Sequence, residues 1–150
     1  MMFSGAKVAL FLGADLLVIR RDDRSDIPWP GHWDFPGGGR EAGETPTECV
    51  LRETWEETSL RLSPADLEWS VSYQRPHGVV WFFAAHLPKA RAGDVRLGSE
   101  GQEWRTMTPR EYCDNPLAVP HFAEQLRIYM SDPNFRRHMS GKPNEKPSAL

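Results

Sequence analysis

A run of carboxylates between residues 37 and 60 is the feature of this 150-residue chain that points most directly to chemistry. Three of its glutamates, Glu53, Glu56 and Glu57, are spaced at i, i+3 and i+4, so on a helix they share one face. Like charges at that spacing repel by roughly 0.2–0.5 kcal/mol for each pair. Mg²⁺ prefers oxygen ligands from a few carboxylates, water and substrate phosphates, and would remove this cost. The spacing therefore predicts a magnesium site completed by a phosphate ligand.

A solvated acidic surface is the alternative explanation of such a run. Solvated helix faces usually mix both signs of charge, however, and the nearest cation here is Arg52, which meets Glu56 at i+4 in the less favourable order. This imbalance favours the metal site.

The carboxylates must stand on a helix for this argument to hold, and the sequence contains a helix start. Thr45 and Glu48 form a capping box, in which each side chain accepts a hydrogen bond from the other residue's free backbone N–H. Pro46 occupies the first helical position, where a missing N–H does no harm. The opposite, packing side of this helix is expected to consist of Leu51, Thr54, Trp55 and Thr58.

The residues around this helix form a pattern. Gly38, Glu44, Arg52, Glu53, Glu56 and Glu57 follow the spacing G-x5-E-x7-R-E-x2-E-E, and Leu60 closes it. This pattern resembles the signature box of the Nudix hydrolase family, and "WDFPGG" (residues 33–38) is similar to the strand-to-loop entry common in its MutT-like branch. Two positions depart from the family pattern. Thr54 replaces an aliphatic residue, and Ser59 replaces the glycine that usually ends the helix.

The resemblance implies a reaction and roles for the box residues. Water would attack a phosphorus of a nucleoside diphosphate derivative, with Mg²⁺ as cofactor and Mn²⁺ as the alternative. The expected metal ligands are Glu53, Glu56, Glu57, the carbonyl of Gly37 and one glutamate from a later loop. Glu53 could also be the general base. Arg52 would orient a catalytic glutamate and Glu44 would brace the loop.

Other candidate residues lie outside the box. Glu100 is preferred over Glu103 as the later glutamate, because it stands in a glycine-flanked loop whereas Glu103 should lie inside a strand. Arg21 resembles the basic residue that some relatives use against substrate phosphates. Trp33 and Phe35 are candidates for stacking on a base, from a larger aromatic set that also contains Trp29, Trp81 and Phe83.

The remaining elements predict an α/β fold. Strands are expected at residues 8–12, 16–21, 67–74, 79–87 and 102–108, a short helix from Pro109, and a final helix over 119–130. Helices on both faces of a mixed sheet give an α/β/α sandwich with a loop–helix–loop box, which is also what the resemblance implies. We expect one domain over residues 1–131 and a largely disordered polar tail over 132–150.

Composition narrows the function classes. The net charge is −3 and the pI is about 5.9, which argues against a nucleic-acid-binding surface. The apolar run at residues 8–19 is too short to span a bilayer and contains Gly13 and Asp15, so we expect no membrane or targeting segment. Two cysteines without CxxC spacing favour a reducing cytoplasm over a disulfide framework or a zinc site. The resemblance leaves monomer and homodimer open.

The leading hypothesis is hydrolysis of a nucleoside triphosphate, because the chain is short and its box is MutT-like. Relatives that remove oxidised guanine nucleotides use an asparagine just before the last helix. That place falls near Ala118, so specificity for 8-oxo-dGTP is not supported. ADP-ribose, other nucleotide sugars, dinucleoside polyphosphates and capped RNA ends remain alternatives. A non-catalytic nucleotide sensor and a passive domain are the other two classes.

Overall fold

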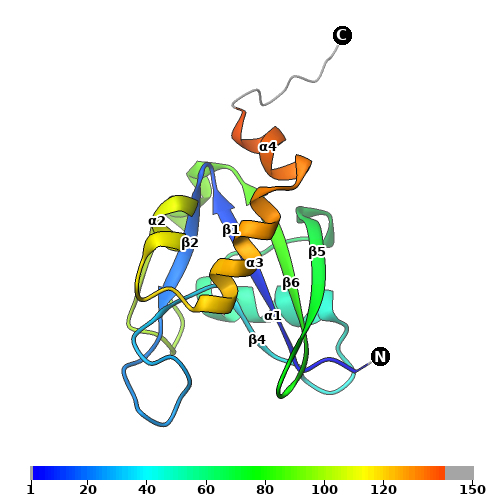
Figure 1. Ribbon diagram of the computed structural model, residues 1–150, viewed down its shortest axis with the longest axis vertical. Helices are drawn as coiled ribbons and strands as arrows, with labels where there is room; N and C mark the ends of the chain where they lie inside the picture. Colours follow the sequence, from blue (N-terminus) through cyan, green and yellow to red (C-terminus); the bar gives the residue numbers. More distant parts are fainter. Residues whose placement is uncertain (1, 141–150) are drawn as a thin grey trace.

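A mixed β-sheet forms the centre of the protein (Figure 1). The computed structural model describes residues 2–140. The strands are β1 (Gly5–Leu12), β2 (Asp15–Arg20), β3 (Trp33–Asp34), β4 (Gly37–Gly39), β5 (Leu67–Arg75), β6 (Gly78–Leu87) and β7 (Glu103–Met107). Their order is β3-β2-β1-β6-β5, with β4 added to β1 and β7 added to β2. β1 and β6 run parallel, and the other pairs are antiparallel.

Helices cover both faces of this sheet. They are α1 (Pro46–Thr58), α2 (Pro109–Asp114), α3 (Pro120–Met130) and α4 (Pro133–Met139), with 3₁₀ turns at Pro64–Asp66 and Lys89–Asp94. α3 crosses the near face in Figure 1 and α1 lies behind the strands. Alternate residues of β1 face the two layers, because side chains in a strand alternate. Phe11 packs in the cluster below α2 and α3, whereas Val8 and Leu10 pack with α1. The predicted α/β/α sandwich is confirmed.

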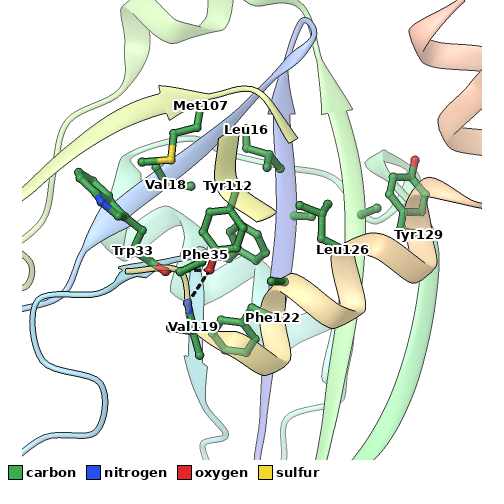
Figure 2. Packing of buried hydrophobic residues seen from close by; sticks show 14 of the residues in the cluster. Leu16, Val18, Trp33, Phe35, Met107, Tyr112, Val119, Phe122, Leu126 and Tyr129 are labelled. Atoms are coloured by element: carbon green, nitrogen blue, oxygen red, sulfur yellow. Dashed lines mark hydrogen bonds between the residues drawn. The ribbon is translucent and has the colours of Figure 1, made fainter. Parts of the chain in front are cut away.

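The core on the α3 side contains two aromatic residues that precede the box, Trp33 and Phe35. Figure 2 shows them beside Tyr112, whose hydroxyl donates to the Trp33 carbonyl at 2.8 Å and accepts from the Val119 N–H at 3.2 Å. These bonds connect β3, α2 and the start of α3, so the strand that leads into the box is held from one side by the helical layer.

Helix α1 has the predicted start. Thr45 and Glu48 form the capping box, and Ser59 ends the helix in the left-handed conformation at φ 64°. The packing face differs from the prediction, because Cys49 and Val50 are also buried and Trp55 is not. Trp55 is 43% exposed, and the Arg61 guanidinium lies 4.0 Å from the centroid of its ring. This cation–π contact favours the ring at the surface.

The chain does not lose its structure at residue 132. Asp132 caps α4 by accepting from the Asn134 N–H at 2.9 Å, and Phe135 and Met139 pack against the core cluster. The expected disorder is therefore corrected for residues 133–139, because two apolar side chains give this polar segment a packing face. Residues 141–150 of the predicted tail lie outside the described residues. None of the helices described has the length and apolarity needed to cross a bilayer.

Candidate metal and phosphate site

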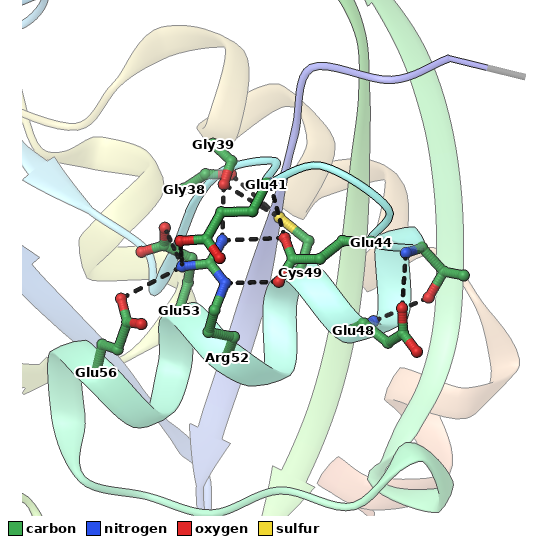
Figure 3. Close-up of polar contacts among 10 residues, drawn as sticks. Gly38, Gly39, Glu41, Glu44, Glu48, Cys49, Arg52, Glu53 and Glu56 are labelled. Carbon is green, nitrogen blue, oxygen red and sulfur yellow. Dashed lines mark hydrogen bonds and ion pairs between the residues drawn. The ribbon is translucent and has the colours of Figure 1, made fainter.

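Arg52 is the centre of the ion-pair network on α1 (Figure 3). Its guanidinium binds the Glu44 carboxylate through two bonds of 2.6 and 3.1 Å, and donates to the Gly39 carbonyl at 2.9 Å. It also contacts Glu53 at 3.0 Å and Glu56 at 3.3 Å. The hydrogen bond from Arg52 lowers the pKa of Glu44, and the same bond is the main cause that raises the pKa of Arg52. Arg52 thus fastens the loop before α1 to the helix.

The glutamates of α1 have different surroundings. The Glu56 side chain is 54% exposed, whereas the Glu53 side chain is 17% exposed. Glu57 points to the loop and accepts a hydrogen bond from the Gly37 N–H at 3.1 Å. Burial raises the pKa of Glu57 to about 8, although Lys7 and the Gly37 N–H both act to lower it. Glu53 and Glu57 therefore face inward, and Glu56 lies at the outer side.

Two glycines bring the loop against these carboxylates. A Cβ atom on Gly38 would lie 2.6 Å from the carboxyl carbon of Glu53. A Cβ atom on Gly37 would lie 2.1 Å from the Ala6 carbonyl oxygen, and its φ of +136° is one that other residues rarely adopt. The backbone therefore requires glycine at position 37, whereas a side chain at position 38 would displace the Glu53 carboxylate.

These groups line a cavity of about 400 Å³, called here the first cavity. Glu53, Glu57 and Glu100 all contribute to its lining, together with the loop Gly37–Gly39. The segment that carries Glu100 is fastened on both sides. Gly98 donates its N–H to the Glu57 carbonyl at 2.9 Å, and the Gln102 N–H donates to the Arg20 carbonyl at 2.8 Å.

Glu103 has a different position. It lies in β7, its side chain is 43% exposed, and it contacts Arg20 and Arg105. The structure thus brings Glu100 to the cavity and leaves Glu103 in a surface pair.

Cations line the same cavity. Asp34, itself buried, accepts from the Lys7 ammonium at 3.0 Å and from the Arg21 guanidinium at 2.8 Å. Lys7 also donates to the Gly37 carbonyl at 3.1 Å. Arg21 was predicted from the sequence, but Lys7 and Asp34 were not. The sequence did contain a signal for this ion pair, because Lys7 lies in an otherwise buried apolar strand and a charge there needs a partner.

The two predicted stacking residues have little free surface. Trp33 is 4% exposed and Phe35 is 1% exposed. The Arg105 guanidinium lies 4.6 Å from the Trp33 ring centroid, and Phe35 packs on Tyr112 with ring centroids 4.7 Å apart. Their prediction as substrate-stacking residues is corrected, because both side chains fill the core.

A second cavity of about 460 Å³ adjoins the first and shares Lys7, Arg21, Gly38 and Gly39 with it. Its other walls include Trp29, Tyr73, Arg75 and His121. Of these, only Trp29 was a sequence candidate for base stacking. Tyr73 and Arg75 were missed, although alternation along β5 places both on the face of Trp69 and Val71, which pack on the core.

The donor set at the first cavity fits a hard divalent cation. It consists of carboxylate and carbonyl oxygens, and Glu57 is an enclosed carboxylate that lacks full compensation by cations. Within residues 2–140, no three acidic, histidine or cysteine side chains are already grouped as a metal site. Arg52 explains this in part, since it draws Glu53 and Glu56 toward itself.

Comparison with known proteins identifies the family that the sequence pattern resembles. The family model described as the NUDIX domain matches residues 2–129. A MutT-like protein of Streptomyces ambofaciens is 36% identical over 69% of this chain and 62% of its own length. The 8-oxo-dGTP diphosphatase of Escherichia coli K12 is 31% identical over 76% of this chain and 88% of its own.

A solved structure shows the same fold. The MutT protein from Methanosarcina mazei Go1 superimposes with a TM-score of 0.68 at 22% identity, over 86% of this chain and 93% of that chain. The chain spans less than two thirds of several curated relatives, with 62%, 27% and 40% of three of them covered. The family model covers most of the sequence, and three of the box residues, Gly38, Glu53 and Glu57, line the first cavity. The chain therefore belongs to the Nudix hydrolase family.

Proposed function

We propose that the protein is a Mg²⁺-dependent hydrolase that cleaves the diphosphate linkage of a nucleoside triphosphate or a related nucleoside diphosphate derivative. The observation that carries the proposal is the first cavity, whose lining contains the carboxylates of Glu53, Glu57 and Glu100 together with the cations of Lys7 and Arg21. A cavity that contains both carboxylates and cations suits a metal ion and a phosphate bound together.

In the proposed reaction, water attacks a phosphorus of the diphosphate. A new P–O bond forms, the bridging P–O bond breaks, and the departing phosphate group leaves with the bridging oxygen. Glu53, as general base, accepts the proton from the water. Lys7 and Arg21 stabilise the charge on the phosphate oxygens, and Asp34 fixes both cations in position.

The proposed metal ligands are Glu53, Glu56, Glu57, Glu100 and the Gly37 carbonyl. A divalent cation bound there would lower the pKa of the attacking water and neutralise phosphate charge. Glu56 would have to leave Arg52 to join this set. That contact is an exposed pair at 3.3 Å, and such pairs contribute about 0–1 kcal/mol, so the change is small.

The test is a panel of nucleoside triphosphates, 8-oxo-dGTP, ADP-ribose, other nucleotide sugars and dinucleoside polyphosphates, with and without Mg²⁺. We expect metal-dependent turnover that falls about 10²–10⁴-fold in Glu57→Gln. Glu124→Gln is the matched control, since Glu124 is exposed on α3, far from the box in sequence, and should keep full activity. Turnover without Mg²⁺, or an active Glu57→Gln, would contradict the proposal.

Two alternatives have distinct outcomes in the same panel. Turnover confined to ADP-ribose or nucleotide sugars would identify a nucleotide-sugar pyrophosphatase. Tight binding of a nucleotide with no turnover would identify a sensor, which the three α1 glutamates disfavour. The name of the E. coli relative makes 8-oxo-dGTP a necessary member of the panel. Asn115, however, accepts from the Leu117 N–H at the end of α2 and is outside both cavities. Cytoplasmic location and a monomer or homodimer stay predictions.

A further inference from the structure

The second cavity contains polar groups that the proposed reaction does not use. Within residues 2–140, the Tyr73 hydroxyl and the Nε atom of Arg75 are buried without a hydrogen-bond partner. Both residues line this cavity. Leaving a buried polar group without a partner destabilises a fold, so two such groups at one cavity point to a ligand that supplies partners.

The other polar side chains at this cavity are mostly engaged. Ser4 donates to the Val79 carbonyl at 3.2 Å, and the Arg21 Nε–H donates to the Pro28 carbonyl at 2.8 Å. Lys7 is held by Asp34. No aspartate or glutamate of the described chain lines the cavity. The Nε–H group of Arg75 is therefore a free donor, and the Tyr73 hydroxyl can donate or accept.

The walls suit a flat aromatic ring. His121 joins two aromatic residues across the cavity, with ring centroids 6.2 Å from Trp29 and 6.5 Å from Tyr73. Trp29 is 38% exposed and has φ 51°, an uncommon conformation for a large side chain. The His32 N–H donates a hydrogen bond to the Trp29 carbonyl at 3.2 Å. The loop thus presents an indole ring at the cavity, where bases stack with little regard to identity.

Stacking alone would not select a base, but the free donors would. A 6-oxopurine offers the oxygen and N7 as two acceptors, which is the edge that arginine recognises in nucleic acids, whereas a 6-aminopurine presents a donor at the same place. A donor that meets another donor in a buried site loses its partner.

We propose that Arg75, as a fixed donor, selects nucleobases with an oxo group over the corresponding amino bases, with the base held in the second cavity beside Tyr73. This inference rests on the proposed function for the position of the phosphates, because the two cavities meet at Lys7, Arg21 and the loop Gly38–Gly39. It adds a base preference, which the family membership does not supply.

The test uses substrate pairs that differ only at the selected group. kcat/KM is measured with Mg²⁺ for ITP against ATP, and for UTP against CTP. We expect the oxo member to be preferred by about tenfold or more. Arg75→Met should bring the ratio close to one. Arg110→Met is the matched control, because Arg110 is exposed on α2 and outside this cavity, and it should leave the ratio unchanged.

Two results would overturn the inference. The first is a wild-type kcat/KM that is nearly equal for the oxo and amino substrates. This measurement uses no variant, so it does not depend on how the variants fold. The other is an equal loss for ITP and ATP in Arg75→Met, which would make Arg75 a general phosphate contact. If no nucleotide of the panel is hydrolysed, the proposed function fails. The base preference is then tested by direct binding of IMP and AMP. Tighter binding of IMP supports the inference, and equal or weaker binding of IMP overturns it.

Discussion

Arg52 determines where the carboxylates of α1 stand before any metal arrives. It holds Glu44 through two bonds and contacts Glu53 and Glu56 with another nitrogen. A lysine keeps the charge but has a single compact ammonium, so it cannot hold Glu44 in this two-bond geometry while reaching the other partners. We predict that Arg52→Lys lowers kcat about 10–100-fold with a smaller change in KM. Steady-state kinetics beside Arg110→Lys would check this, and an unimpaired Arg52→Lys would contradict it.

The two adjacent glycines of the box loop make a matched pair. A methyl group on Gly38 would meet the Glu53 carboxylate, whereas a methyl group on Gly39 would meet no atom within 4 Å. Because Glu53 is a flexible side chain, it can move away at small cost in stability but leaves its position. We predict that Gly38→Ala lowers kcat/KM at least about tenfold while Tm changes little, and that Gly39→Ala keeps activity. Equal activity of the two variants would show that the Glu53 position is unimportant.

The direction of each side chain is what the sequence could not predict at this scale. Residue type and spacing identified the cluster of Glu53, Glu56 and Glu57, but not that Arg52 turns Glu56 outward, since that depends on competition among several partners. Trp33 and Phe35 were assigned to the substrate for a similar reason. An aromatic residue in a pattern gives no sign of which neighbours cover its ring.

At the scale of the element, α1 contains a buried defect. Thr54 is fully buried and, within the described chain, its hydroxyl has no partner, contrary to the usual i−4 carbonyl bond. Thr58, one turn on, donates to the Thr54 carbonyl at 2.7 Å and accepts from the Leu60 N–H at 3.1 Å. We predict that Thr54→Val raises the free energy of unfolding by about 1 kcal/mol, and that Thr58→Val lowers it by about 1–3 kcal/mol. Urea denaturation of both variants would check this, and a destabilised Thr54→Val would refute it.

Elements with local signals were the ones that the sequence predicted. The capping box of Thr45 and the long apolar strands were confirmed because their signals lie within a few residues. β3 and β4 are only two and three residues long and exist through pairing with β2 and β1, so no local pattern could show them. The same holds for α4, whose docking depends on a core built from distant segments.

At the scale of the whole molecule, a histidine stack joins the sheet to the end of the chain. His86 of β6 lies between Phe11 of β1 and His138 of α4, with ring centroids 4.4 and 3.7 Å away. Its Nε2 is 2.6 Å from the Tyr129 hydroxyl of α3. His138 contacts Glu68 of β5 at 2.8 Å, and Arg137 is also near that carboxylate. The α4 docking thus depends on an uncharged imidazole at residue 86.

Burial, with smaller contributions from His138 and Arg137, lowers the pKa of His86 to about 3. In the unfolded chain the ordinary value of about 6.5 applies, so between these values the unfolded state binds the extra proton. The stability that the neutral ring provides is complete above about pH 6.5 and is lost as pH falls toward 3. One such proton changes the free energy of unfolding by at most about 1.4 kcal/mol per pH unit.

We predict that the free energy of unfolding falls as pH is lowered from 7 to 4, and that His86→Phe flattens this dependence. Phenylalanine keeps the stack on Phe11 but leaves the Tyr129 hydroxyl without its partner, so the variant should be about 1 kcal/mol less stable at pH 7. In the slope that remains, His121, whose pKa burial lowers to about 4, acts in the same direction as His86, and Glu57, whose pKa burial raises to about 8, acts in the opposite direction. Urea denaturation at several pH values, with His77→Phe as the exposed control, measures the slopes. An unchanged slope in His86→Phe would mean that protonation of this stack does not govern acid stability.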